Sequence, residues 1–171
     1  MVRYADPGEL EWVESGGGPL TAVPEAVLPF WSGADGEGPA TDYDRACDID
    51  GDAALLPVGD GTALVLGGEP AATSYLPDHG VLVRWSAANS EEELLAGARA
   101  GLESAEWGSE LRWRIPGPVV LFDSAWPGEG LAGAEHLRVP LEAGTYAVRA
   151  AYVQPEPETW IGLVRLTRLG P

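Results

Sequence analysis

Lysine is missing from this sequence altogether. All ten basic residues of the 171-residue chain are arginines. This absence excludes a phosphate-binding loop that depends on lysine, a Schiff base and a lysine general base. The chain also lacks the serine elbow of α/β-hydrolases and any glycine-rich loop with dinucleotide-binding spacing. Several common classes of enzyme are therefore excluded by residue type and spacing alone.

Cysteine, histidine and long apolar runs are almost as scarce. One cysteine cannot form an internal disulfide, so we expect a reducing compartment. The N-terminal residues show no apolar segment of a signal peptide, and no run of apolar residues is long enough to span a membrane. The two histidines and Cys47 lack the paired spacing of a zinc site. We therefore predict a cytoplasmic protein with no membrane partner, no metal and no cofactor.

Positive charge is scarce as well. The sequence has 27 acidic residues against ten arginines, which gives a formal net charge of −17. Such a field repels nucleic acid and anionic membranes and attracts a basic partner. With 45% hydrophobic residues and seven tryptophans, the chain has the composition of a folded domain and not of a disordered segment.

Most of the chain reads as strands. Alternating or apolar runs bounded by glycine and proline predict strands at 10–15, 20–23, 53–58, 62–66, 73–76, 81–87, 110–115, 119–124, 136–141, 145–153 and 159–169. Residues 25–31 predict a short helical turn. One main helix is expected near residues 90–106, because Ser90 with Glu93 fits a capping box and apolar residues follow at helical spacing. We predict a single domain over residues 1–171 of the α+β class, β-rich, with mostly antiparallel sheets and one main helix.

The stretch TDYDRACDID at 41–50 has the highest density of charge. If it is extended, its aspartates share one face, while Tyr43, Arg45 and Cys47 share the other. We predict a strand here, with Cys47 facing the core. The alternative is a single helical turn, which places Tyr43 beside Cys47 and Asp44 beside Asp48.

The same stretch offers two chemistries that its details oppose. Residues 48–52 open like a calcium loop, but Ala53 stands where that loop needs glycine and Gly59 where it needs glutamate. Cys47 lies among carboxylates, which raise the pKa of a thiol and disfavour the thiolate nucleophile. A hydrolase with paired carboxylates stays open, because 27 acidic residues supply many pairs.

Five segments together resemble a known family. They are WVESGGGPL at 12–20, DYDRAC at 42–47, PVGDGTALVLGGEPAATSYLP at 57–77, VLVRW at 81–85 and LFDSAWPG at 121–128. This set is similar to the immunity protein 21 family, antidotes in bacterial polymorphic toxin systems. The resemblance implies an inhibitor that binds a cognate protein toxin inside the cell, and it brings no catalytic residues.

The resemblance and the charge lead to one main hypothesis: a non-enzymatic protein that neutralises a toxin, with a basic nuclease as the best-matched target. The residues expected to bind this partner are Asp42, Tyr43, Asp44, Arg45, Asp48, Asp50, Asp123 and Trp126. In the strand interpretation the aspartates face the toxin and Arg45 serves the structure. The alternatives are a solvated acidic face without a partner, a β domain that binds a small molecule or carbohydrate through its tryptophans, and the hydrolase.

Overall fold

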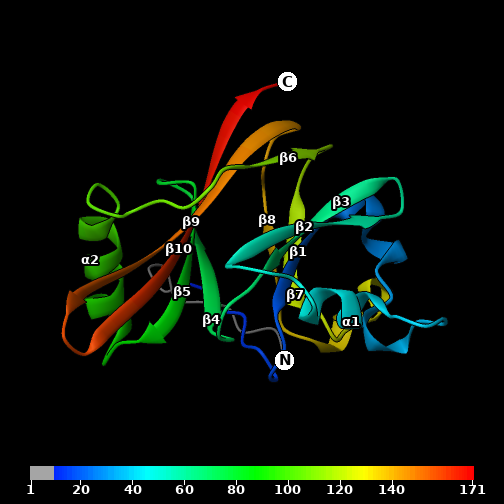
Figure 1. Ribbon diagram of the computed structural model, residues 1–171, viewed down its shortest axis with the longest axis horizontal. Coiled ribbons are helices and arrows are strands. Elements are labelled where there is room, and N and C mark those ends of the chain that lie inside the picture. The colour runs from blue at the N-terminus through cyan, green and yellow to red at the C-terminus, as the bar shows by residue number, and fades with distance from the viewer. Residues whose placement is uncertain (1–9) are drawn as a thin grey trace.

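A computed structural model describes residues 10–171 (Figure 1). Two five-stranded antiparallel sheets stack on each other, and each outer face is covered by a different set of helices. The first sheet has the order β2-β3-β1-β7-β8, formed by Ala53–Val58, Gly61–Leu66, Leu20–Pro24, Val119–Asp123 and His136–Val139. The second has the order β4-β5-β10-β9-β6, formed by Ala72–Leu76, Val81–Ala87, Thr159–Gly170, Gly144–Glu156 and Leu111–Ile115. The β-rich antiparallel class expected from the sequence is confirmed.

The hairpins follow the turn signals of the sequence. Asp60 and Gly59 connect β2 to β3, and Gly59 has a φ of 55°, which glycine adopts without a steric penalty. In the second sheet β9 and β10 form one long hairpin that extends beyond the sandwich toward the lower left of Figure 1. This hairpin lies between β5 and β6, and therefore supplies the centre of that sheet.

The main core lies between the two sheets. Leu20, Leu64 and Leu121 from the first sheet pack on Trp113 and Val164 from the second, and all five side chains are buried. Arg84 on β5 is also buried and donates to the carbonyls of Gly67 at 2.6 Å and Glu69 at 3.2 Å. Burial lowers the pKa of this guanidinium. Since Gly67 follows β3, Arg84 ties the chain that leaves the first sheet to the second sheet.

The helix α2, Glu91–Gly101, covers part of the outer face of the second sheet. Its N-terminus is capped by the Ser90 hydroxyl, which accepts from the backbone N–H of Glu93 at 3.1 Å. Only this half of the expected capping box forms, because the Glu93 carboxylate accepts from Thr159 instead. Gly97 fits the contact with the sheet, since a Cβ there would lie 2.7 Å from Pro155. The main helix is thus confirmed, but it ends at Gly101, earlier than predicted.

The outer face of the first sheet is covered by shorter pieces. They are the 3-10 helices η1, Glu25–Phe30, η2, Gly33–Asp35, and η3, Gly128–Gly133, together with the short helix α1, Asp42–Cys47. Val27 of η1, Ala46 of α1 and Trp31, just after η1, are buried and pack on Val65 and Phe122 of the sheet. Figure 1 shows these pieces on the right, on the opposite side of the molecule from α2.

Two predicted strands are wrong. Residues 10–15 form no strand beyond a single antiparallel bridge between Val13 and Thr73, at the free edge of β4. The acidic stretch at 42–47 is helical. Within residues 10–171 no helix has the length and apolar character needed to cross a membrane.

Candidate partner-binding surface

The stretch DYDRAC forms helix α1, and the residue before it explains why. The hydroxyl of Thr41 accepts from the backbone N–H of Asp44 at 3.1 Å, and the Asp44 carboxylate accepts from the backbone N–H of Thr41 at 2.9 Å. This reciprocal capping box satisfies two backbone donors at the helix start. The alternation of aspartates therefore does not mark a strand. Their spacing places Asp44 and Asp48 at i and i+4 on the helix surface.

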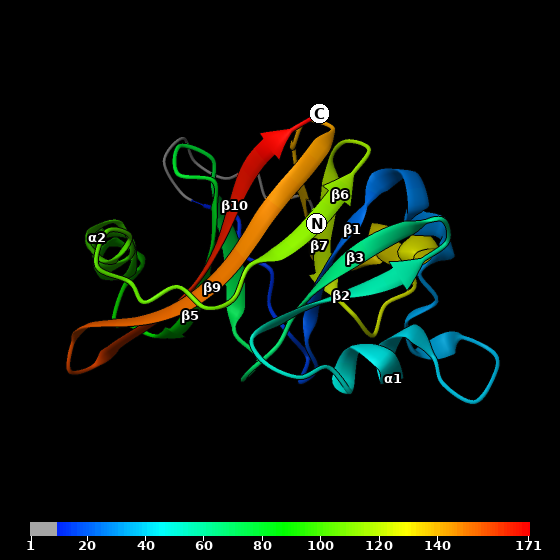
Figure 2. The same ribbon diagram turned by 45° about the horizontal axis from the view of Figure 1, so that its top comes forward.

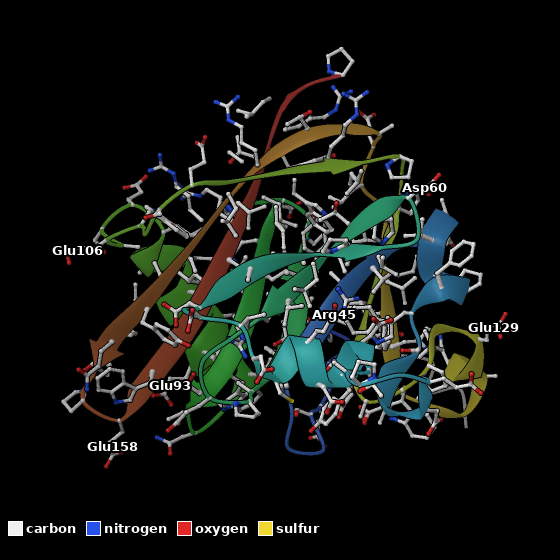
Figure 3. All side chains as sticks on the ribbon, turned by 45° about the vertical axis from the view of Figure 1, so that its right-hand side comes forward. Arg45, Asp60, Glu93, Glu106, Glu129 and Glu158 are labelled. Atoms are coloured by element: carbon white, nitrogen blue, oxygen red, sulfur yellow. The ribbon has the colours of Figure 1, made fainter. Side chains whose placement is uncertain are left out.

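Asp42 and Arg45 serve to attach α1 to the rest of the fold. The Asp42 carboxylate accepts from the backbone N–H of Ser32 at 2.8 Å and pairs with the Arg45 guanidinium. Arg45 Nη2 also donates to the carbonyl of Pro57 at 3.0 Å, which reaches strand β2. Figure 3 shows Arg45 between α1 and the strands above it. Both charges are thus engaged within the molecule.

Tyr43 is held against the glycine-rich turn that precedes β1. A Cβ on Gly18 would lie 2.6 Å from Cε2 of Tyr43, so only glycine leaves room for this ring. Hydrogen bonding and electrostatic interaction with the Cys47 side chain raise the pKa of the Tyr43 hydroxyl. The prediction that Cys47 faces the core is wrong: the helix leaves the thiol exposed and buries Ala46 instead.

Asp123 is buried and connects two loops through hydrogen bonds. Its carboxylate accepts from the backbone N–H of Gly16 at 2.7 Å and from that of Ala125 at 3.0 Å. The neighbouring Ser124 carbonyl accepts from the Trp31 indole at 3.0 Å. The GGG, DYDRAC and FDSAW segments, far apart in the sequence, therefore meet in one place. The hydrogen bonds of Asp123 to backbone N–H groups therefore stabilise the contact between these loops, which is a structural role.

Four of the eight predicted partner-binding residues remain exposed. They are Asp44, Asp48, Asp50 and Trp126, and we call them the acidic surface. Trp126 is 45% exposed and lies in a loop whose backbone packs on Gly33 of η2, which in turn contacts α1. No group of three or more His, Cys, Asp or Glu side chains in residues 10–171 is arranged to hold a metal ion. The arrangement offers carboxylates and one large aromatic side chain to a partner, which is the chemistry of an interaction surface.

Sequence reasoning missed two further features. Phe30 on η1 is 65% exposed, although its ring lies against the turn glycine Gly59. Four arginines, Arg112, Arg114, Arg149 and Arg165, stand on one face of β6, β9 and β10. The alternation in LRWRI identifies the first two as outward-facing, but only the pairing of β9 with β6 and β10 adds the others.

The rival functions gain little from the geometry. A carbohydrate site needs an apolar cleft with several aromatic side chains. Of two grooves on the surface, of about 250 and 530 Å³, the first contains Trp107 and the second contains Tyr152 on its edge. Both are open and mainly lined by polar or small residues. This alternative predicts an open apolar cleft lined by tryptophans, whereas the first groove has one tryptophan beside Glu110 and two arginines, and the second has none.

Comparison with known proteins gives one family. The family model described as Immunity protein 21 matches residues 11–159 of the 171-residue chain. Comparisons with curated proteins and with solved structures find no match. The family match includes every segment on which the resemblance was based, together with α1, α2, the whole first sheet and all strands of the second sheet except β10. This chain belongs to the immunity protein 21 family.

Proposed function

We propose that this protein is a cytoplasmic immunity protein that binds and neutralises a cognate toxin of a polymorphic toxin system. The observation that carries the proposal is the family match over residues 11–159. Neutralisation requires only that the toxin's working surface is occupied, so no bond is made or broken by the immunity protein. The absence of lysine and the engagement of Asp42 and Asp123 with backbone groups agree with such a role.

The acidic surface is the proposed contact. Asp44, Asp48 and Asp50 offer carboxylates to basic groups, and Trp126 offers a large area that becomes buried on binding. A net charge of −17 favours a basic toxin, and a nuclease fits best because its cationic surface already binds an anion. Tyr43 and Arg45 would act one step away, by holding α1 in position.

Coexpression with the product of the neighbouring gene, toxic when expressed alone if the proposal holds, tests the role. We expect restored growth and copurification of the two proteins. The contact surface is tested by the double variant Asp48→Arg with Asp50→Arg, which we expect to slow association about tenfold at low salt. Asp78→Arg is the control, and its effect is compared per reversed charge because it reverses one charge and the double variant two; Asp78 is an exposed acid in the turn between β4 and β5 of the other sheet.

Two outcomes would count against the proposal at different levels. Failure of the wild-type protein to rescue growth or to copurify would remove the toxin-binding role itself. Rescue with an association rate that is insensitive to salt, or equal effects per reversed charge of the double variant and Asp78→Arg, would instead remove the acidic surface and the basic target.

A further inference from the structure

The outer face of the second sheet is only half covered. Helix α2 packs over Ile161, Leu163 and Val153, which lie in the part of β9 and β10 near their hairpin turn. The opposite part, toward β6 and the end of β10, carries no helix, as Figure 2 shows. In place of a covering layer it presents arginines.

Strand register gathers these arginines. Arg165 on β10 lies directly opposite Arg149 on β9, so two like charges face each other across one pair of strands. Arg112 and Arg114 on β6 pair with Ala147 and Thr145 of β9, which places them on the same face two and four residues along. We call these four residues the arginine face. They are four of the ten arginines in a chain with a charge of −17.

The arginine face keeps a net positive charge, because its arginines outnumber the carboxylates that pair with them. Like charges directly opposite each other on a sheet are destabilising, and natural sheets commonly avoid them. Here Glu110 contacts both Arg112, at 3.3 Å, and Arg149, at 3.6 Å. One carboxylate thus serves two guanidinium groups and leaves positive charge in excess.

Arg165 plays a different part from the other three. Its guanidinium lies 4.2 Å from the centre of the Trp107 ring and donates to the carbonyl of Leu102, just after α2, at 3.2 Å. It therefore holds the end of the helix and forms one wall of a groove of about 250 Å³, whose other lining residues include Arg149, Thr167 and Leu169. Leu169 is 49% exposed and supplies an apolar contact at the end of the groove.

From this arrangement we propose that the arginine face is a second interaction surface, and that it binds an acidic protein segment. Guanidinium groups bind carboxylates with paired hydrogen bonds, and the groove with Leu169 accommodates one side chain beside them. Nucleic acid fits less well, because its dense and continuous charge meets the repulsion of the whole molecule. An acidic peptide carries its carboxylates on flexible side chains that can each meet one guanidinium group, and salt screens its charges from the rest of the molecule beyond roughly 8 Å at physiological ionic strength.

The arginine face lies on the opposite outer side of the sandwich from the acidic surface. Its binding of an acidic segment does not depend on the proposed function. The neutralisation assay and the binding assay below can therefore fail separately.

Binding of a fluorescein-labelled octaglutamate peptide tests this proposal. We expect saturable binding by the wild-type protein, and a loss of about tenfold in affinity when Arg112, Arg114 and Arg149 are all replaced by glutamine, since exposed ion pairs are weak singly and act here as a set. Arg138→Gln is the matched control, because Arg138 is an exposed arginine of the first sheet that pairs with Glu25. It should change the affinity less than twofold.

Glu110→Gln distinguishes binding by the arginines from a purely structural role of the ion pairs between Glu110 and the arginines. Removing this carboxylate frees positive charge, so octaglutamate should bind more tightly. Weaker binding by Glu110→Gln, no saturable binding by the wild type, or equal effects of Arg138→Gln and the triple variant would overturn the proposal. Tighter binding of octathymidylate than of octaglutamate would overturn it in favour of a nucleic-acid surface.

Discussion

The two outer faces of this sandwich are covered in different ways. On the second sheet a single helix, α2, packs an apolar stripe of Leu94, Ala98 and Leu102 against the strands. On the first sheet, short helices without a continuous stripe bury single apolar residues such as Val27 and Ala46. The surrounding layer is held in addition by side chains that bind backbone groups, such as Asp42 on Ser32 and Asp123 on Gly16. The single helix α2 covers only part of the second sheet, and the arginine face lies on the part that it leaves uncovered. Hydrogen bonds from backbone N–H groups to carboxylates hold several aspartates close together in the layer around α1.

This difference has a consequence for stability. Burial of apolar area is non-directional, so its loss scales with the volume that is removed. A side chain that binds a backbone amide acts at one point, and its removal leaves the amide without a partner. We therefore expect a large cost for truncation under α2, and smaller, position-dependent costs in the layer around α1.

The largest effect is expected from Leu94→Ala. Leu94 is fully buried between α2 and the second sheet, so truncation removes apolar contacts and leaves a cavity. We expect a loss of about 3 kcal/mol in the free energy of unfolding. Urea denaturation measures it, with the half-buried Leu95→Ala as the control on the same helix. A cost for Leu94→Ala no larger than that of the control would mean that α2 is not held by its apolar stripe.

Gly33→Ala tests the opposite layer. Gly33 has a φ of 61°, and a Cβ there would lie 2.5 Å from the backbone carbon of Trp126. Left-handed backbone and a clash with backbone atoms should together cost about 2–3 kcal/mol. Gly38→Ala is the control for the backbone alone, since Gly38 has a φ of 111° and open space around its Cβ position. Equal costs for the two variants would show that the loop of Trp126 does not pack tightly on η2.

Asp42→Ala tests a polar attachment directly. It removes the acceptor of the Ser32 N–H and the partner of Arg45, so we expect a loss of about 1–2 kcal/mol in unfolding free energy. Asp48→Ala is the matched control: Asp48 is exposed at the C-terminus of α1, where a negative charge is unfavourable, and its removal should change stability by less than about 0.5 kcal/mol. Thermal unfolding compares them. The reverse order would exclude Asp42 as the attachment of α1.

The same contrast explains which parts of the molecule could be predicted from the sequence. The hairpins around Asp60 and the helix after Ser90 are encoded by neighbouring residues, through turn glycines, a cap and a stripe at helical spacing. The class of fold follows from these local signals. In these parts the local conformational preferences of the residues are consistent with the structure that forms.

The layer around α1 is encoded differently. Whether Asp42 faces a partner or a backbone amide depends on Ser32, and the role of Asp123 depends on Gly16, 107 residues away. The aspartates at every second position therefore do not identify a strand, since the same sequence also forms a six-residue helix with a capping box at Thr41. The arginine face is equally non-local, because it appears only when β6, β9 and β10 are placed side by side.

The smallest effect is expected from the capping box of α1, and pH reveals it. The Thr41 backbone N–H, and then the Thr41 side chain, stabilise the ionised Asp44 carboxylate and lower its pKa below the ordinary 3.8. A group with a lowered pKa contributes its stabilisation above its unfolded pKa and loses it as pH falls through the folded value. The difference in melting temperature between the wild type and Asp44→Ala should therefore be small but present at neutral pH, and disappear as the pH falls below 3.8 and through the folded pKa. Asp44→Asn is the control, since its amide oxygen still accepts from Thr41 and does not titrate. If the difference stayed constant in acid, the carboxylate would contribute nothing to the cap, and α1 would be held by its tertiary contacts alone.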